Sequence, residues 1–236
     1  IWFWKNIAAG HPTLGRKDFP LFAYGVSSVS TTATMMVRMH STTATGVSNE
    51  HHARVALNGT TIGEGWWTGI TSNILTMTFS QSLLIEGSNS VEVTGLRDAG
   101  VPYSTFYVNH FDVIYTREYA AHGDLLHVRG EGNAVITVDG FTNGTLMAMD
   151  VTVPTRPQVV QGMLVESSGV NRWRASLAPQ SAQSEYVLSS IAGVKTPAWL
   201  KVDESSRLKL ATTEADYVII TVPELRSGAI TLADYR

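Results

Sequence analysis

The sequence predicts an all-β protein of two antiparallel β-sandwiches, the first jelly-roll-like and the second smaller and Ig-like. The strand and helix that open a truncated α/β domain follow them. Apolar and polar residues alternate with a period of two through two successive series of short segments, as in half-buried strands. Turn-forming residues separate the segments at intervals of roughly ten residues, the spacing of a small sandwich. From residue 215 an apolar run is followed by a helical pattern, which is how a βαβ unit begins.

The composition favours a β-rich extracellular protein. Of the 236 residues, 44% are hydrophobic and only 16% are charged, and Thr, Ser, Gly and Asn make up the difference. The net charge is −3 and no basic stripe is visible, so nucleic acid is not expected as a partner. The sequence has no cysteine, which excludes disulfides, thiolate metal sites and a cysteine nucleophile within these residues. No apolar run is long enough to span a bilayer.

The first series of strands predicts a jelly-roll-like sandwich over residues 1–118. Residues 1–25 are rich in turns, and the alternation begins near Thr31. Asn58-Gly59 supplies the two positive-φ residues of a tight hairpin turn. A run of short strands with little helix favours an antiparallel sandwich. The expected strand faces are Met35, Val37 and Met39; Ala53, Val55 and Leu57; Leu75, Met77 and Phe79; Val91 and Val93; and Phe111, Val113 and Tyr115.

The second series of strands predicts a smaller, Ig-like sandwich over residues 119–213. The alternation pauses near residues 117–123 and then resumes with the same spacing of strands and turns. Asp139-Gly140 and Ser168-Gly169 mark two of the turns, because these residues tolerate the backbone conformations that tight turns require. The expected strands cover residues 124–128, 134–138, 146–151, 159–165, 173–177, 186–188 and 208–210.

Residues 214–236 predict the start of a truncated α/β domain. A strand over residues 215–221 is followed by a helical pattern, but a parallel sheet also needs a return strand. We therefore expect the apolar surface of this strand and helix to lack its partner. The first residues also lack the charged start and cleavage site of a signal peptide. The two ends together predict a segment from inside a longer precursor.

Three stretches resemble the gingipain-type cysteine peptidases. The tail Ala215-Asp216-Tyr217-Val218-Ile219-Ile220-Thr221, with Leu232-Ala233-Asp234-Tyr235-Arg236 after it, resembles the first strand and helix of that peptidase domain. Met149-Asp150-Val151-Thr152-Val153-Pro154-Thr155-Arg156-Pro157 is similar to the segment that precedes the catalytic domain in this family and in the related sortase of the type IX secretion system. Residues 109–117 are similar to the last strand of the jelly-roll module found upstream in such proteins.

The resemblance implies a secreted or surface-attached bacterial protein in which a peptidase domain follows these residues. Catalysis in the family uses a cysteine and a histidine of that later domain, so no catalytic residue carries over to this chain. The implied role is a non-catalytic accessory region that positions or shields the peptidase, or is removed as a pro-region. A carbohydrate- or cell-surface-binding module and a purely structural role are the alternatives.

Aromatic residues of the first sandwich are the candidate ligand-binding residues. Trp66, Trp67, Tyr103 and Tyr107 could form a platform on which the apolar faces of sugar rings stack. Trp66 and Trp67 are adjacent, so in a strand one of them points inward as part of the core. The alternative is therefore that this pair serves packing rather than glycan binding.

Carboxylates near strand ends are the candidate metal ligands. Glu64 and Asp98, with Glu86 and Asp112 as further candidates, could hold a structural Ca²⁺ together with backbone carbonyls. No local run has the alternating Asp/Asn spacing of a dedicated calcium loop, so the alternative is that these carboxylates bind no metal.

The adjacent histidines His51 and His52 also suggest a metal site. Neighbouring residues on a strand point to opposite faces, so the pair could chelate one ion only from a turn. The favoured interpretation is a solvated polar loop over residues 48–52.

Overall fold

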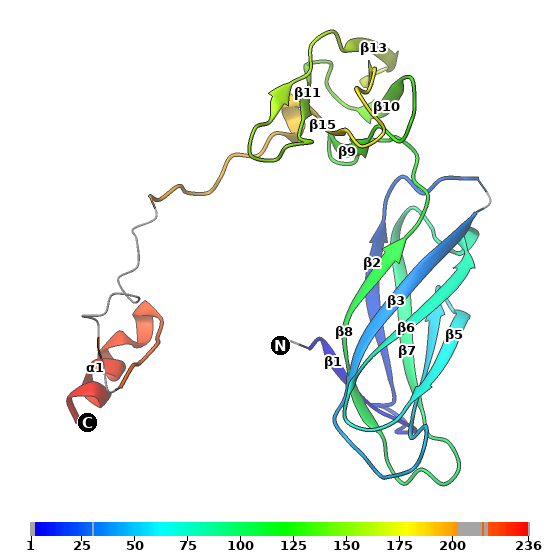
Figure 1. Cartoon of the computed structure of the whole chain (residues 1–236), viewed down its shortest axis with the longest axis vertical. Coiled ribbons are helices and arrows are strands. Elements are labelled where there is room, and N and C mark those ends of the chain that lie inside the picture. The colour runs from blue at the N-terminus through cyan, green and yellow to red at the C-terminus, as the bar shows by residue number, and fades with distance from the viewer. Residues whose placement is uncertain (1–2, 30, 203–213, 215–216, 236) are drawn as a thin grey trace. The chain divides into compact units, whose positions relative to one another are not determined.

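The computed structural model describes residues 3–29, 31–202, 214 and 217–235. The chain divides into a first compact unit, Ile1–Val194, and a second, Lys195–Arg236. The described residues of the first unit hold fifteen β-strands, all paired antiparallel within four sheets. The second has one α-helix, α1 (Arg226–Tyr235), among its described residues. The predicted all-β, sandwich-like fold is confirmed (Figure 1).

The first sandwich is a jelly roll of two four-stranded sheets. One sheet has the strand order β1-β8-β3-β6 and the other has the order β2-β7-β4-β5. The first strand pairs with the last and the second with the last but one, which is the nested pairing of a jelly roll. The strands are β1 (Lys5–Ala8), β2 (Arg16–Ala23), β3 (Thr32–Ser41), β4 (His51–Leu57), β5 (Thr60–Trp67), β6 (Ser72–Ser80), β7 (Gly87–Leu96) and β8 (Thr105–Ile114).

Period-two alternation places the core of this sandwich between its sheets. Along β3 the side chains of Met35, Val37 and Met39 are buried, while the residues between them are partly exposed. The hairpin between β4 and β5 turns at Asn58 and Gly59, whose φ angles are 48° and 83°. Both angles are positive, as a two-residue turn matched to the strand twist requires. The predicted strand faces and this turn are confirmed.

The second sandwich repeats the nested pairing with seven strands. Its sheets have the orders β12-β11-β15-β9 and β10-β14-β13. An Ig constant domain also divides seven strands into four and three, but there the first strand pairs with the second. The strands are β9 (Leu125–Arg129), β10 (Ile136–Phe141), β11 (Leu146–Asp150), β12 (Gln158–Val159), β13 (Leu164–Gly169), β14 (Arg172–Leu177) and β15 (Glu185–Ser190). The strand expected at residues 208–210 lies outside the described residues.

Each sandwich has its own hydrophobic core. The buried residues of the first core run from Ile7 to Val108, and those of the second run from Leu126 to Leu188. Phe106 is fully buried in the first core, and Tyr186 is buried in the second. The domain boundaries expected after residues 118 and 213 stay predictions.

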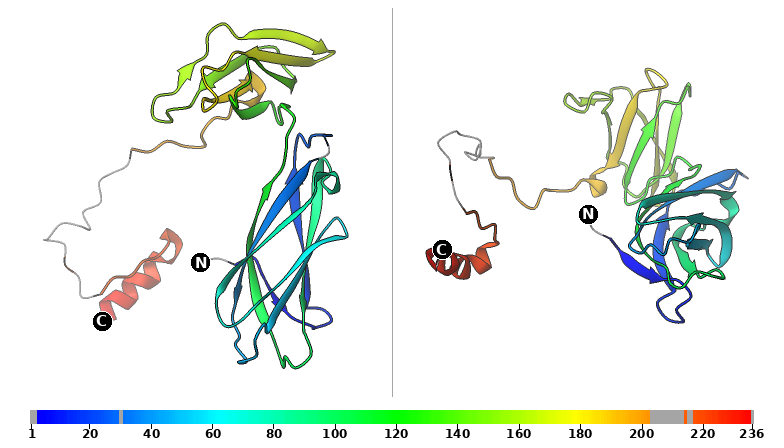
Figure 2. Two further views of the ribbon diagram at one scale, coloured as in Figure 1. Left: turned by 45° about the vertical axis from the view of Figure 1, so that its right-hand side comes forward. Right: turned by 60° about the horizontal axis from the view of Figure 1, so that its bottom comes forward.

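The second unit differs from the expected strand and helix. The helix is present as α1, after a 3-10 turn over Pro223–Leu225. Residues 215 and 216 lie outside the described residues, and residues 217–221 form no strand, so the predicted strand is wrong over its described part. A strand requires a neighbour for its backbone groups, and Figure 2 shows the described stretch before α1 without a strand arrow.

Apolar side chains of this unit are exposed. α1 has no buried residue, and Ile220, Leu225 and Ile230 are all exposed. In the described part of the chain, no helix is long and apolar enough to cross a membrane.

Candidate functional site around Trp66

The two adjacent tryptophans of β5 have different environments. Trp67 is buried and meets the ring of Phe106 edge-on, with 5.1 Å between ring centroids. Trp66 points to the opposite face of the sheet and is 48% exposed. The interpretation that one of the pair belongs to the core is confirmed. Only Trp66 remains available to a ligand.

Two contacts fix the indole of Trp66. His52 lies directly opposite it on β4, and the two rings stack with their centroids 4.1 Å apart and their planes 28° from parallel. The indole Nε1–H donates a hydrogen bond of 2.9 Å to Asp98 Oδ2. Both the tilt and the rotation of the ring are therefore set in the unbound protein.

His52 is itself held between two carboxylates. Its Nδ1 lies 2.9 Å from Asp98 Oδ1, and its Nε2 lies 3.2 Å from Glu64 Oε2. Each ring nitrogen therefore faces a carboxylate oxygen, so the two carboxylates fix the orientation of the imidazole. Arg54 Nε in turn donates to Glu64 Oε1. One connected network thus joins β4, β5 and the loop after β7.

The network keeps its carboxylates ionised. Hydrogen bonds from His52 and then Trp66 lower the pKa of Asp98. A hydrogen bond from Arg54 is the main cause of the lowered pKa of Glu64. Arg54 places one permanent positive charge beside the two carboxylates. Trp66 and these four residues are called the Trp66 ledge below.

The predicted metal ligands have other partners. Glu64 and Asp98 do converge, but on His52. Glu86 accepts backbone hydrogen bonds from Gly25 and Val26, and Asp112 pairs with Arg38 and His110 on the other sheet. Among the described residues, no group of three or more His, Cys, Asp or Glu is arranged to hold a metal ion. The structural calcium ion stays a prediction.

The two candidate tyrosines do not complete a single platform. Tyr107 lies on β8, in the sheet that does not contain β5, and its ring stacks on Phe3 at 5.1 Å. Tyr103 is exposed in the loop between β7 and β8. Of the predicted site residues, Trp66, Glu64 and Asp98 are therefore brought together, whereas Trp67 and Tyr107 are placed elsewhere.

The solvated loop expected over residues 48–52 is correct for Ser48 and Asn49, which are exposed, and wrong for residues 50–52. His51 and His52 belong to β4 and are buried, as is Glu50. His51 Nδ1 lies 2.8 Å from Ser104 Oγ, so a serine, a histidine and a glutamate occur together. None of the three side chains reaches the surface, and the Glu50 carboxylate binds backbone N–H groups. The cluster therefore joins loops rather than meeting a substrate.

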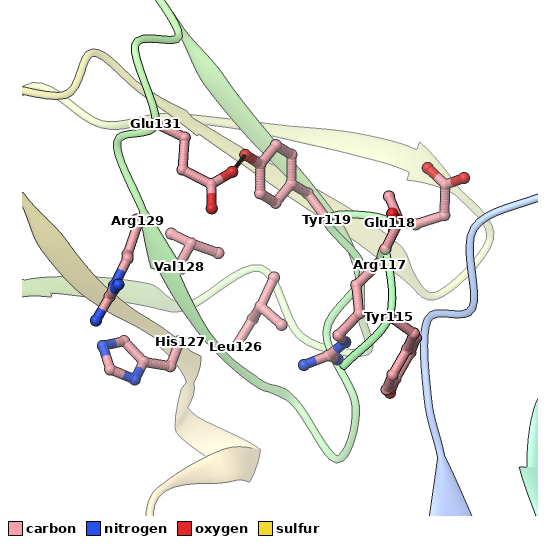
Figure 3. A pocket seen from close by; sticks show the side chains of 10 residues that line it. Tyr115, Arg117, Glu118, Tyr119, Leu126, His127, Val128, Arg129 and Glu131 are labelled. Atoms are coloured by element: carbon pink, nitrogen blue, oxygen red, sulfur yellow. Dashed lines mark hydrogen bonds between the residues drawn. The ribbon is translucent and has the colours of Figure 1, made fainter. Parts of the chain in front are cut away.

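An open cavity lies beside the edge strand β9. It is lined by residues 115–119 and by residues from Leu126 to Glu131. Figure 3 shows the Tyr119 hydroxyl meeting the Glu131 carboxylate, 3.2 Å apart. Arg129 and His127 both pair with Glu185, at 2.7 and 3.4 Å. Two further charged side chains of the cavity also have partners, because Arg117 donates to the carbonyl oxygen of Tyr24 and Glu118 accepts from the hydroxyl of Ser27.

Comparison with known proteins gives a likeness in fold. No model of a protein family matches the sequence, and no curated protein matches it either. The backbone is similar to the crystal structure of dimeric latent PorU from Porphyromonas gingivalis, with a TM-score of 0.56 and 8% identity. The match covers 80% of this chain and 18% of that chain, so this chain spans less than a fifth of the PorU length.

Two further structures match at lower TM-scores. One is the carbohydrate-binding module CBM36 in complex with calcium and xylotriose, with a TM-score of 0.32, 16% identity and coverage of 45% of this chain and 78% of that one. The other is a Paenibacillus xanthan lyase, with a TM-score of 0.31, 12% identity and coverage of 75% and 22%. Neither similarity is high enough to support an argument about fold or ligand.

Proposed function

We propose that the chain is a non-catalytic accessory region of a secreted or surface-attached, gingipain-like bacterial cysteine peptidase. It would position or shield a catalytic domain that follows it in the same protein. The observation that carries this proposal is the backbone likeness to PorU across 80% of the chain. The chain has no cysteine, so a thiol nucleophile would have to come from the later domain.

The exposed apolar surface of the second unit supports the same proposal. Ile220, Leu225 and Ile230 are open to solvent, and full burial of each such side chain would contribute about 1.5–3 kcal/mol. The described stretch before α1 is also apolar and is not part of a strand. A following α/β domain would supply both missing partners.

Expression of the gene product beyond Arg236 tests the proposal. We expect the extended protein to cleave peptides and to lose this activity when thiols are alkylated. Deletion of residues 1–194 from the extended protein should change the KM or the degree of latency, because these residues position or shield the active site. An extended protein without a paired cysteine and histidine, or with cleavage that is indifferent to alkylation, would contradict the proposal.

Carbohydrate binding by the first sandwich is a second candidate function. The observation that favours it is the half-exposed indole of Trp66, which is oriented by His52 and Asp98. Fixed aromatic rings with polar groups at their rim are typical of sites that recognise sugar rings. Such binding could attach the protein to a polysaccharide whether or not a peptidase follows.

A further inference from the structure

We propose that the Trp66 ledge binds an uncharged pyranose ring of a glycan, with the sugar stacked on the exposed indole face. This inference rests on the second candidate function and names its site and its ligand class. The site consists of Trp66, His52, Arg54, Glu64 and Asp98.

The first argument is that the indole is preorganised. The His52 ring supports it at 4.1 Å, and the bond to Asp98 prevents its rotation. Immobilising a side chain costs conformational entropy and so weakens binding. The indole of Trp66 is already immobilised by the protein, so ligand binding does not incur this cost. His52 and Asp98 thus hold the ring directly, while Glu64 holds His52 and Arg54 holds Glu64.

The second argument is that only the indole ring face remains for the ligand. Nε1–H is already donated to Asp98, so the indole cannot offer its hydrogen bond to a partner. One ring face is covered by His52, and Trp66 is nevertheless 48% exposed. A flat apolar surface of this kind suits the C–H face of a pyranose.

The third argument concerns the polar groups beside the ring. The side chains of Arg54 and Asp98 are 43% and 44% exposed. Arg54 uses its Nε for Glu64, which leaves the guanidinium further donors, and each carboxylate oxygen can accept a second hydrogen bond. Donors and acceptors therefore lie side by side. Sugar hydroxyls both donate and accept, and match that pattern.

The fourth argument is the charge of the ledge. Two carboxylates, Glu64 and Asp98, accompany the single guanidinium of Arg54, whose Nε already donates to Glu64, so the site offers an anionic ligand no excess of positive charge. A uronate or sulfate would approach two carboxylates whose pKa values are lowered by their hydrogen bonds. Like charges brought together disfavour binding. A neutral ring avoids that repulsion.

The aromatic stack on the other sheet does not present an equivalent site. There the protein's own Phe3 stacks on Tyr107 and on His40, at 5.1 and 5.6 Å. The ring face that a sugar would need is already covered. Trp66, by contrast, is both exposed and held in place by His52 and Asp98.

Fluorine NMR of protein labelled with 5-fluorotryptophan tests the proposal. The chain has six tryptophans, and Trp66→Phe assigns the resonance of interest. Neutral cello-, xylo- and manno-oligosaccharides and anionic oligogalacturonates and alginate oligomers are titrated separately. We expect a neutral oligosaccharide to shift the Trp66 resonance. Its affinity should fall at least tenfold in Trp66→Ala and severalfold in Asp98→Ala, which releases the indole.

Trp199→Ala is the matched control, because it removes an indole that is 75% exposed and has no part in the ledge. It should leave the affinity unchanged, and Asp98→Asn, which keeps an acceptor for Nε1–H, should restore most of what Asp98→Ala loses. If only anionic glycans shift the Trp66 resonance, the proposed neutral ligand class is wrong, although the sandwich still binds a glycan. If Trp66→Ala binds the glycan as tightly as the unmodified protein does, the proposed location of the site is wrong. If no glycan binds, both the inference and the second candidate function fail.

Discussion

Replacement of Asp124 by alanine is expected to unfold the second sandwich under conditions that leave the first one folded. Asp124 is buried at the start of β9. Its carboxylate accepts hydrogen bonds from the backbone N–H and the hydroxyl of Thr142, both 2.7 Å long, and from the hydroxyl of Ser190 at 2.8 Å. One side chain thereby joins the beginning of β9 to the turn after β10 and to the end of β15.

The alanine variant loses these bonds and strains the backbone. Burial works to raise the pKa of Asp124, and the hydrogen bonds from Thr142 and Ser190 outweigh it, so the pKa is lowered. Without the carboxylate, the N–H of Thr142 and the hydroxyl of the fully buried Ser190 lose this acceptor. The φ angle of 61° also suits Asp better than Ala. Together these effects should cost about 3 kcal/mol, a large share of the stability of a small domain.

Hydrogen exchange at increasing urea concentrations measures this effect separately in each sandwich. Peptides from β9 to β15 should lose protection at lower urea in Asp124→Ala, while those from β3 to β8 keep theirs. Asp124→Asn is the control. It retains an acceptor for the Thr142 N–H, and the Thr142 hydroxyl can rotate to accept from the new amide. An alanine variant as stable as the unmodified protein would refute the prediction. If Asp124→Asn is as unstable as Asp124→Ala, the loss of stability comes from the loss of the negative charge.

Replacement of Glu50 by alanine is expected to have the second-largest effect, in the first sandwich. The buried carboxylate accepts a hydrogen bond of 2.8 Å from Gly69 N and further bonds from the N–H and hydroxyl of Thr45. It therefore ties the loop before β4 to the loop after β5. Two backbone N–H groups lose their acceptor in Glu50→Ala, which should destabilise this sandwich by about 2–4 kcal/mol.

The same carboxylate makes the stability of the first sandwich depend on acid. Its pKa is lowered from 4.5, chiefly by the hydrogen bond from the Thr45 side chain. Because the pKa is lower in the folded than in the unfolded protein, this contribution to stability is complete above about pH 4.5 and is lost as the pH falls through the folded value. The melting temperature of the unmodified protein should decline over that range, and that of Glu50→Gln should decline less.

The glutamine variant also distinguishes hydrogen bonding from charge. Its amide oxygen can still accept from Gly69, but its amide N–H₂ would face the Thr45 N–H, so two donors meet. We expect a loss of stability near neutral pH that is smaller than in Glu50→Ala. The exposed Glu224 serves as the control, because Glu224→Gln should leave both the melting temperature and its pH dependence unchanged. Equal acid profiles for Glu50→Gln and the unmodified protein would show that Glu50 does not carry the effect.

The sequence pattern predicted the strands better than the contacts between them. Alternation assigned the inward face of β3, and Asn58-Gly59 located a hairpin, because both signals are local. His51 had such a signal too, since it continues the inward row of Ala53, Val55 and Leu57 with a spacing of two. The polar residues that precede it favoured the interpretation of a loop instead.

The Trp66 ledge could be predicted only in part. Trp66, Glu64 and Asp98 were selected as candidates, but for two separate sites. His52 joins them, and it lies 46 residues before Asp98 in the sequence, a separation at which no periodic signal exists. The apolar run before α1 shows the opposite failure. Its composition favours a strand, yet a strand forms only where another strand accepts its backbone hydrogen bonds.

Hydrogen exchange of residues 217–235 gives the most direct test of the central proposal. The proposal is that these residues are the first part of a peptidase domain that continues beyond Arg236, and that residues 1–194 are accessory to that domain. The comparison is between this chain and the gene product extended beyond Arg236. The account predicts rapid exchange in this chain and strong protection in the extended protein, where the apolar run and α1 would join a sheet. Strong protection in this chain alone, or equally rapid exchange in both proteins, would contradict it.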